Sequence, residues 1–213
     1  MRERAGVVVA GAANLALLVL PLAVTGHAAR ALVDPPTCAF LTLATLFCVT
    51  ELTTQAGEGS AVDDVTAVRL ARATGLAMLA VFWGGLLRRD AQTGTAHAAL
   101  VIAGALLMIS GVALRRAAIR ALGDFFVSDT RVWPGQKLVT TGIYARMRHP
   151  SETGLLAIAL GSAALLQSEA ALAVAILVMA PLVIVRIRRE DRHLARAFAS
   201  EHARYASRVG AFL

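Results

Sequence analysis

Charged side chains are scarce in this sequence. Asp, Glu, Lys and Arg make up 16% of its 213 residues, whereas hydrophobic residues make up 57%. A soluble domain carries roughly 25% charged residues. The mean hydropathy of the chain is +0.66. This composition argues against an ordinary soluble domain and predicts an integral membrane protein.

Cysteine is almost absent, and the motifs of common metal and nucleotide sites are missing. Cys38 and Cys48 lie in one apolar run at a spacing that fits no zinc site, so we interpret them as small apolar residues. Glu190 and His193 form half of a di-iron carboxylate motif that has no second copy. The sequence contains no His-Glu-x-x-His, P-loop, dinucleotide-binding glycine motif or serine elbow. We therefore predict no metal site.

The apolar residues are concentrated in blocks, and a membrane-spanning helix needs about 20 such residues. The last two blocks are short and are interpreted as a helical hairpin that turns at Gln167-Ser168-Glu169; one long bent helix is the alternative. We predict an all-α polytopic membrane helical bundle with five to six transmembrane segments, forming a single membrane domain over residues 1–213. The blocks are Val7–Val24, Pro36–Val49, Ala73–Leu87, Ala96–Leu114, Gly154–Leu166 and Ala170–Val185.

The positive charge indicates an orientation in the membrane rather than a nucleic-acid partner. The net charge is +7 at pH 7. If both termini are cytoplasmic, all but three of the 21 Lys and Arg residues lie on the inner side; the exceptions are Arg30, Arg88 and Arg89. This is the positive-inside pattern, and such residues contact anionic lipid head groups. We predict a multi-pass protein of the inner (cytoplasmic) membrane with both termini in the cytoplasm.

The chain divides at about Leu114. Residues 1–114 hold apolar segments rich in small residues, which we interpret as a helical scaffold. The first block is longer than the core of a usual signal peptide, so we expect it to be retained. Glu51 is interpreted as part of a solvated acidic region after the second block. Residues 115–213 hold the polar clusters and form the expected cofactor-binding and catalytic half. Arg115–Phe126 is predicted to be a short amphipathic helix on the inner membrane surface.

A basic cluster precedes the predicted hairpin. Proline is favoured at the first position of a helix and disfavours helix in the preceding residue. The hairpin is therefore predicted to begin at Pro150, with His149 at its cap and Arg148 beside it. The helix dipole, the guanidinium and the imidazole would together bind a carboxylate or phosphate. Taken singly, such residues more often extend a charge toward the membrane surface or cap a helix.

Residues 186–213 are predicted to form a cytoplasmic amphipathic helix. Arg189, Arg192 and Arg196 fall on its polar side. Carboxylates seldom face inward unpaired, so those on the packed face are expected to pair with Arg148 or to bind a polar ligand. Glu201 shares this face. At 100° per residue, the packed face carries Glu190, Asp191, Leu194, Phe198, His202 and Tyr205.

Three pieces of the sequence occur in a recognisable order over about the last 80 residues. They are Leu138–Tyr144, then Arg148–Pro150 with Gly154, and, after the apolar hairpin, Glu190, Asp191, Leu194, Phe198, Tyr205 and Arg208-Val209. In this order they resemble the isoprenylcysteine carboxyl methyltransferase and phospholipid methyltransferase superfamily of integral membrane enzymes. The resemblance implies a methyltransferase that uses S-adenosylmethionine and acts on a hydrophobic, lipid-like or isoprenylcysteine-like acceptor, with methylation of a carboxylate favoured.

The resemblance also implies roles for individual residues. Tyr144, His149 and Pro150 would bind the amino-acid end of the cofactor. Glu190 would bind its ribose or hold the tail helix over it, and Arg148 would face the acceptor. Arg148 and Glu190 are thus the expected catalytic residues. The expected cofactor-binding set is completed by Asp191, His202 and Tyr205.

The sequence departs from the family pattern at four positions. Glu152 replaces a tyrosine, Asp191 a second glutamate, Ala199 a glycine and His202 the first tail tyrosine. We interpret Glu152 as a carboxylate that complements the helix dipole. Two alternatives are an NADPH-dependent reductase of the sterol-reductase kind, which has a similar Arg-His-Pro stretch, and a non-catalytic membrane relative. Binding of S-adenosylmethionine, of NADPH or of neither separates the three.

Overall fold

The computed structural model describes residues 16–24, 33–54, 65–87, 95–123 and 137–212, and over these ranges the secondary structure is helical, without strands. Residues 16–24 are helical. They are followed by α3 (Pro35–Thr54), α4 (Val65–Leu87), α5 (Thr95–Leu122) and the short 3-10 helix η2 (Gly142–Ala145). The all-α fold class predicted from the sequence is confirmed.

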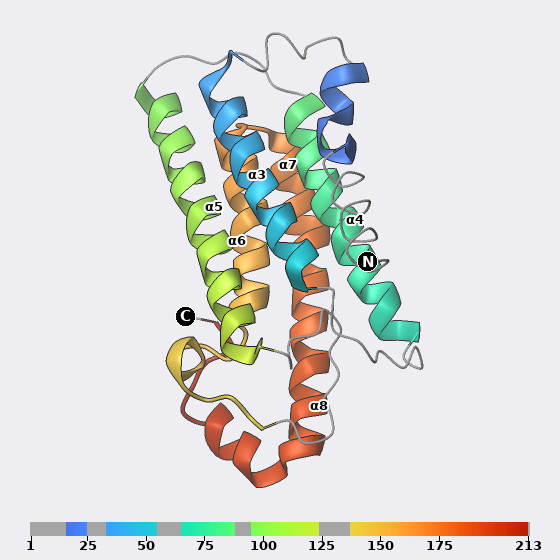
Figure 1. Ribbon diagram of the computed structural model, residues 1–213, viewed down its shortest axis with the longest axis vertical. Helices are drawn as coiled ribbons and strands as arrows, with labels where there is room; N and C mark the ends of the chain where they lie inside the picture. Colours follow the sequence, from blue (N-terminus) through green and yellow to red (C-terminus); the bar gives the residue numbers. More distant parts are fainter. Residues whose placement is uncertain (1–15, 25–32, 55–64, 88–94, 124–136, 213) are drawn as a thin grey trace, which may run out of the picture.

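The last part of the chain forms the predicted hairpin. Its first arm is α6 (Pro150–Leu165). Its second arm consists of α7 (Glu169–Val174), the π-helical turn η3 (Ala175–Met179) and α8 (Ala180–Ala206), which follow one another directly. Figure 1 shows α3 to α7 side by side in one bundle, with α8 continuing past its lower end.

The turn between the arms lies at the predicted place, which excludes one long bent helix. Gln167 adopts a positive φ of 52°. The Ser168 hydroxyl accepts a hydrogen bond from the Ala171 amide at 3.1 Å and donates one to the Gly84 carbonyl at 2.8 Å. Ser168 therefore caps α7 and also ties the turn to α4.

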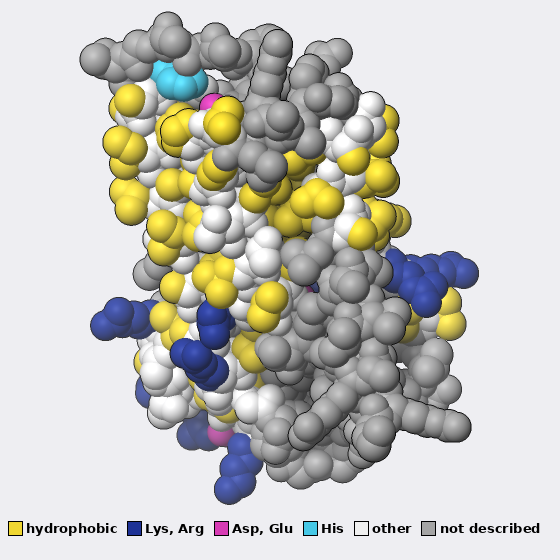
Figure 2. Space-filling view, turned by 45° about the horizontal axis from the view of Figure 1, so that its top comes forward, with side chains coloured by type: hydrophobic (Ala, Val, Ile, Leu, Met, Phe, Trp, Pro, Cys, Tyr) yellow, Lys and Arg dark blue, Asp and Glu magenta, His cyan; other side chains and the backbone are white. Residues whose placement is uncertain are grey.

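Three described helices are long and apolar enough to cross a bilayer: Val65–Leu87, His97–Leu122 and Glu169–Ala206. Large apolar side chains remain exposed on them, including Leu76 at 67% and Leu177 at 73%. In Figure 2 apolar side chains cover the upper half of the visible face and Lys and Arg appear in the lower half. The chain is therefore a membrane protein. The number of crossings and the orientation stay predictions, and Arg30, Arg88 and Arg89 lie outside the described residues.

Helices α5 and α6 pack backbone to backbone on glycine. A Cβ atom added at Gly104 would lie 2.3 Å from the Leu165 nitrogen, and one at Gly161 would lie 2.6 Å from the Met108 nitrogen. About two helical turns further along, Gly111 and Gly154 face each other, and a Cβ on either would lie 2.7 Å from the carbonyl oxygen of the other. Small residues allow such close approach between apolar helices. This seam fixes the position of α6 and of the residues at its start.

The predicted surface helix at Arg115–Phe126 was wrong. Helix α5 continues through this region to Leu122, and residues 124–126 lie outside the described ranges. Arg115 is only 3% exposed, and its guanidinium pairs with Glu51 of α3. Because this partner compensates the charge, the helix does not have to leave the apolar bundle at the first arginine.

The predicted tail helix is amphipathic as expected but is not continuous. Ala199 has φ 37° and ψ −110°, so α8 bends there. Beyond the bend, the chain turns back beneath the bundle (Figure 1), and the amides of Arg148 and His149 donate to the carbonyls of Gly210 and Ala211 at 2.9 and 3.3 Å. The bend thereby brings the end of the chain against the start of α6.

Ala199→Gly is expected to stabilise the protein by about 1 kcal/mol, because glycine adopts a positive φ without the steric cost that a Cβ imposes. The family pattern has glycine at this position. The matched control is Ala203→Gly, at an exposed and regularly helical position of α8, which should destabilise by roughly 1 kcal/mol. Thermal unfolding in nanodiscs, followed by circular dichroism, measures both changes. Equal destabilisation by the two glycines would contradict the strain assigned to Ala199.

Candidate functional site

The start of α6 meets α8 in a cluster of two carboxylates around one imidazole. Pro150 is the first residue of α6 and His149 is its N-cap, as predicted. The His149 side chain is fully buried, and its two ring nitrogens contact different acids of α8. Nδ1 lies 3.1 Å from Glu190 Oε2, and Nε2 lies 3.0 Å from Asp191 Oδ1. His149 therefore fixes the rotation of α8 against α6.

Two more basic side chains complete this cluster. Arg148 Nη1 donates to Asp191 Oδ1 at 3.1 Å. His202, carried back by the bend in α8, places Nε2 3.4 Å from the same oxygen. The five residues Arg148, His149, Glu190, Asp191 and His202 are called the acid–imidazole cluster below. The predicted pairing of the tail carboxylates with Arg148 is thus observed for Asp191.

The cluster holds His149 in its charged form. Burial lowers the pKa of His149, but hydrogen bonds to Asp191 and Glu190 and the negative charges of both acids outweigh burial and raise the pKa to about 9. At neutral pH the ring is therefore an imidazolium, and both N–H groups donate to the acids. One third of the Glu190 side chain (33%) remains exposed, so this carboxylate can still accept hydrogen bonds from a ligand.

The two predicted tyrosines, Tyr144 and Tyr205, lie beside this cluster and contact each other. Tyr144 lies in η2, which begins at Gly142 with a positive φ of 61°. The Tyr205 hydroxyl donates to the Tyr144 carbonyl at 2.6 Å, and both side chains are buried. Burial and the charge of Glu190 raise the pKa of Tyr144 well above its usual range, so its hydroxyl stays protonated. All seven predicted cofactor-binding residues thus lie on elements that meet at one place.

A buried ion pair in the scaffold half was missed from the sequence. Glu51, interpreted as part of a solvated acidic region, forms a two-pronged pair with Arg115, whose Nη2 donates to Glu51 Oε2 at 2.6 Å. Arg115 Nη1 also donates to the Ser151 hydroxyl at 2.6 Å. The available signal was an arginine directly after an apolar block, because a charge at that depth requires a partner.

Glu152 forms a second buried pair, so its interpretation as a complement to the helix dipole was incomplete. It does lie in the first turn of α6, but its carboxylate contacts Arg186 of α8. Arg186 Nε lies 3.0 Å from both carboxylate oxygens, and Nη2 donates to Oε1 at 2.7 Å. Both residues are nearly inaccessible to solvent, at 5% and 6%. The residue that departs from the family pattern therefore neutralises a buried arginine.

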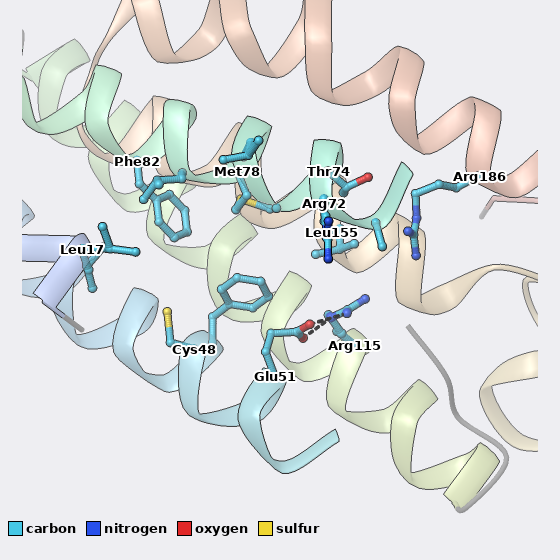
Figure 3. Close-up of a pocket in the computed structure, with 16 residues that line it drawn as sticks. Leu17, Cys48, Glu51, Arg72, Thr74, Met78, Phe82, Arg115, Leu155 and Arg186 are labelled. Atoms are coloured by element: carbon cyan, nitrogen blue, oxygen red, sulfur yellow. Dashed lines mark hydrogen bonds and ion pairs between the residues drawn. The ribbon is translucent and has the colours of Figure 1, made fainter. Parts of the chain in front are cut away.

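The Glu51–Arg115 pair and the Arg186 side chain of the second pair line a cavity of about 620 Å³ that lies mainly between α3 and α4. Its apolar part includes Leu17, Phe47, Met78 and Phe82. Figure 3 shows Leu17, Cys48 and Phe82 toward one end and Glu51, Arg72, Arg115 and Arg186 toward the other. This space, called the α3–α4 cavity below, thus combines a long apolar wall with a cationic end. Arg186 also lies one helical turn before Glu190, so the cationic end is close to the acid–imidazole cluster.

Comparison with known proteins finds similarity in the second half of the chain. Residues 99–201 match the family model described as phospholipid methyltransferase. The chain is 33% identical over 111 residues to the protein-S-isoprenylcysteine O-methyltransferase of Saccharomyces cerevisiae. The aligned region covers 51% of this chain and 46% of that protein. It is 34% identical over 109 residues to protein-S-isoprenylcysteine O-methyltransferase B of Arabidopsis thaliana, covering 50% and 55%.

A probable protein-S-isoprenylcysteine O-methyltransferase of Oryza sativa subsp. indica is 31% identical over 108 residues, covering 50% of this chain and 56% of the relative. The chain thus spans about half the length of the curated relatives it matches. Over this half, the resemblance to the isoprenylcysteine carboxyl and phospholipid methyltransferase superfamily is confirmed.

Proposed function

Because its second half matches a family of membrane methyltransferases, we propose that this chain is an S-adenosylmethionine-dependent methyltransferase that methylates a carboxylate on a lipid-like, isoprenylcysteine-like acceptor. The observation that carries the proposal is the position of the acid–imidazole cluster one helical turn from the cationic end of the α3–α4 cavity. A polar donor and an apolar acceptor would therefore meet between Glu190 and Arg186.

The acid–imidazole cluster suits the donor. S-adenosylmethionine carries an α-amino acid group, ribose hydroxyls and a positively charged sulfonium. Arg148 Nε is buried without a hydrogen-bond partner among the described residues, and His202 Nε2 makes no hydrogen bond there although it lies 3.4 Å from Asp191. Both are donors or potential donors to a carboxylate. Glu190 and Asp191 are partly exposed and accept hydrogen bonds from an ammonium or from hydroxyl groups. The orphaned groups and the two acids thus supply complementary partners for a zwitterionic, positively charged ligand.

The residues of this chain would act mainly by binding and orientation. When bound, S-adenosylmethionine supplies a methyl group on a sulfonium, which is already a good leaving group. An acceptor carboxylate held by this chain would take that methyl group, with a C–O bond formed and the C–S bond broken, and the thioether would keep the electron pair. No proton moves, so no general base is required. Arg148 would bind the carboxylate of the donor or of the acceptor. Tyr144 and Tyr205 would cover one side of the site, and the apolar surroundings would exclude water.

The acceptor half of the proposal rests on the α3–α4 cavity. Its apolar wall fits a hydrocarbon chain, and its cationic end fits a carboxylate. We place this end at the cytoplasmic surface of the inner membrane, with both termini inside, because the basic residues gather on that side. A reporter fused after Leu213 and found outside the cell would contradict this orientation.

Titration of the nanodisc-reconstituted protein with S-adenosylhomocysteine tests the donor. We expect saturable binding that His149→Ala weakens by at least about tenfold, because the variant removes two charge-assisted hydrogen bonds that position Glu190 and Asp191. Glu190→Gln should weaken binding similarly. The matched control is Arg192→Gln, which changes an exposed residue of the same helix and should leave the affinity unchanged.

The same titration with NADPH separates the alternatives. Binding of NADPH in place of S-adenosylhomocysteine would support the reductase, and binding of neither would support the non-catalytic relative. Equal effects of Glu190→Gln and Arg192→Gln would remove Glu190 from the site.

A further inference from the structure

The cationic end of the α3–α4 cavity contains three arginines that differ in their partners. Arg115 pairs with Glu51, and Arg186 pairs with Glu152. Arg72, on α4, lines the same cavity, is exposed and has no ion pair with any residue that the structure describes. The first two guanidiniums are therefore already neutralised, and the third is available to a ligand.

Among the residues that the structure describes, one guanidinium at this end keeps an uncompensated charge. Arg115 and Arg186 each pair with a carboxylate, whereas Arg72 has no described partner. The other two guanidiniums, Arg115 and Arg186, are buried at 3% and 6% exposure. A ligand that brings one negative charge can pair with Arg72, whereas a second negative charge would have to lose hydration at this buried end without gaining a partner. The cavity thus complements an amphiphile with an apolar chain and one negative charge.

We propose that Arg72 makes the cavity selective for such monoanionic amphiphiles, a carboxylate being the simplest, over neutral and doubly charged head groups. This inference rests on the proposed function, because the monoanion would be the methyl acceptor. Arg72 is a specificity residue rather than a catalytic one. It lies outside residues 99–201, the part that matches the methyltransferase family, so the scaffold half would determine which acceptor is used.

The two carboxylates provide the discrimination against dianions. A second negative charge on the ligand would need another cation, and Arg115 and Arg186 are held by Glu51 and Glu152 at distances of 2.6 and 2.7 Å. Drawing Arg186 away would leave the buried Glu152 carboxylate without its partner, and drawing Arg115 away would do the same to the partly buried Glu51, which is costly in an apolar interior. A phosphate monoester head group would therefore bind less well than a carboxylate on the same chain.

Equilibrium binding of radiolabelled palmitate to the full chain in nanodiscs of neutral phospholipid tests the inference. Hexadecanol and hexadecyl phosphate serve as competitors at about pH 8, where the carboxylate carries one negative charge and the phosphate monoester nearly two. We expect wild-type protein to bind palmitate, with each competitor at least about tenfold weaker. Arg72→Gln should weaken palmitate binding about tenfold and abolish the preference over hexadecanol, whereas Arg72→Lys should retain most of both.

The matched control is Arg69→Gln, an exposed arginine of the same helix that does not line the cavity, and it should behave as the wild type. Equal palmitate affinities of Arg72→Gln and Arg69→Gln, or equal competition by the three head groups, would overturn the inference. S-adenosylhomocysteine is titrated in parallel. Arg72→Gln should retain full affinity for it, so a defect confined to palmitate supports the inference. Failure of the wild type to bind S-adenosylhomocysteine would instead overturn the proposed function, independently of the palmitate result.

Discussion

Glu152→Gln is expected to destabilise the folded protein by about 3–5 kcal/mol, the usual cost of breaking a buried ion pair from one side. The substitution preserves the size of the side chain but leaves the Arg186 guanidinium, which is 6% exposed, without its compensating charge. Unfolding in detergent–dodecyl sulfate mixtures, followed by circular dichroism, measures the change.

Two further variants separate the ion pair from the site around it. Glu201→Gln removes an exposed carboxylate from the same tail and should change stability by less than about 0.5 kcal/mol. Glu152→Leu combined with Arg186→Met replaces both charges by apolar groups and should recover most of the stability lost in Glu152→Gln. If Glu152→Gln were no more destabilising than Glu201→Gln, the pair would not be a structural element.

The helical architecture could be predicted because local rules decide it. Apolar blocks of sufficient length indicated helices, and the proline after His149 indicated where α6 begins. The hairpin turn followed from the polar residues between two short blocks, and Ser168 caps α7 there. Each of these features depends on a few neighbouring residues, so a single sequence contains the information. The bend at Ala199 also had a signal, because the family pattern has glycine at that position.

The acid–imidazole cluster could be predicted in part. Helical spacing placed Glu190, Asp191, His202 and Tyr205 on one face, and the structure brings that face to His149. Spacing alone did not show that both acids share one imidazole. That arrangement depends on how far α8 is rotated against α6, which is determined by contacts between residues more than 40 positions apart.

Which residues pair in the two ion pairs could not be predicted for the same reason. Glu51 and Arg115 are 64 positions apart, and Glu152 and Arg186 are 34 apart. An arginine at the end of an apolar block is compatible both with the membrane surface and with a buried partner, and only the packing of the bundle decides between them. The cavity, and the absence of a described partner for Arg72, depend on the same packing, so the sequence analysis used Arg72 only to predict the orientation in the membrane.

Gly161→Leu is expected to prevent native packing of α5 against α6, and Gly161→Ala is expected to destabilise by about 3 kcal/mol. Even the alanine Cβ would lie 2.6 Å from the Met108 nitrogen and 2.8 Å from the Gly104 carbonyl oxygen. Both atoms belong to the α5 backbone, so no side-chain rotation relieves the overlap, and the two helices must separate. The dodecyl sulfate unfolding midpoint measures the loss.

The control is Gly75→Ala in α4, where an added Cβ meets nothing within 4 Å. Alanine there should be neutral or stabilising by up to about 1 kcal/mol, because it favours helix over glycine. Gly161 is about three helical turns from His149, so the separation of α5 and α6 in Gly161→Ala should also displace the acid–imidazole cluster at the start of α6. Gly161→Ala should therefore weaken S-adenosylhomocysteine binding, although it changes no residue of that cluster. Equal stability of Gly161→Ala and Gly75→Ala would show that the α5–α6 seam does not fix α6.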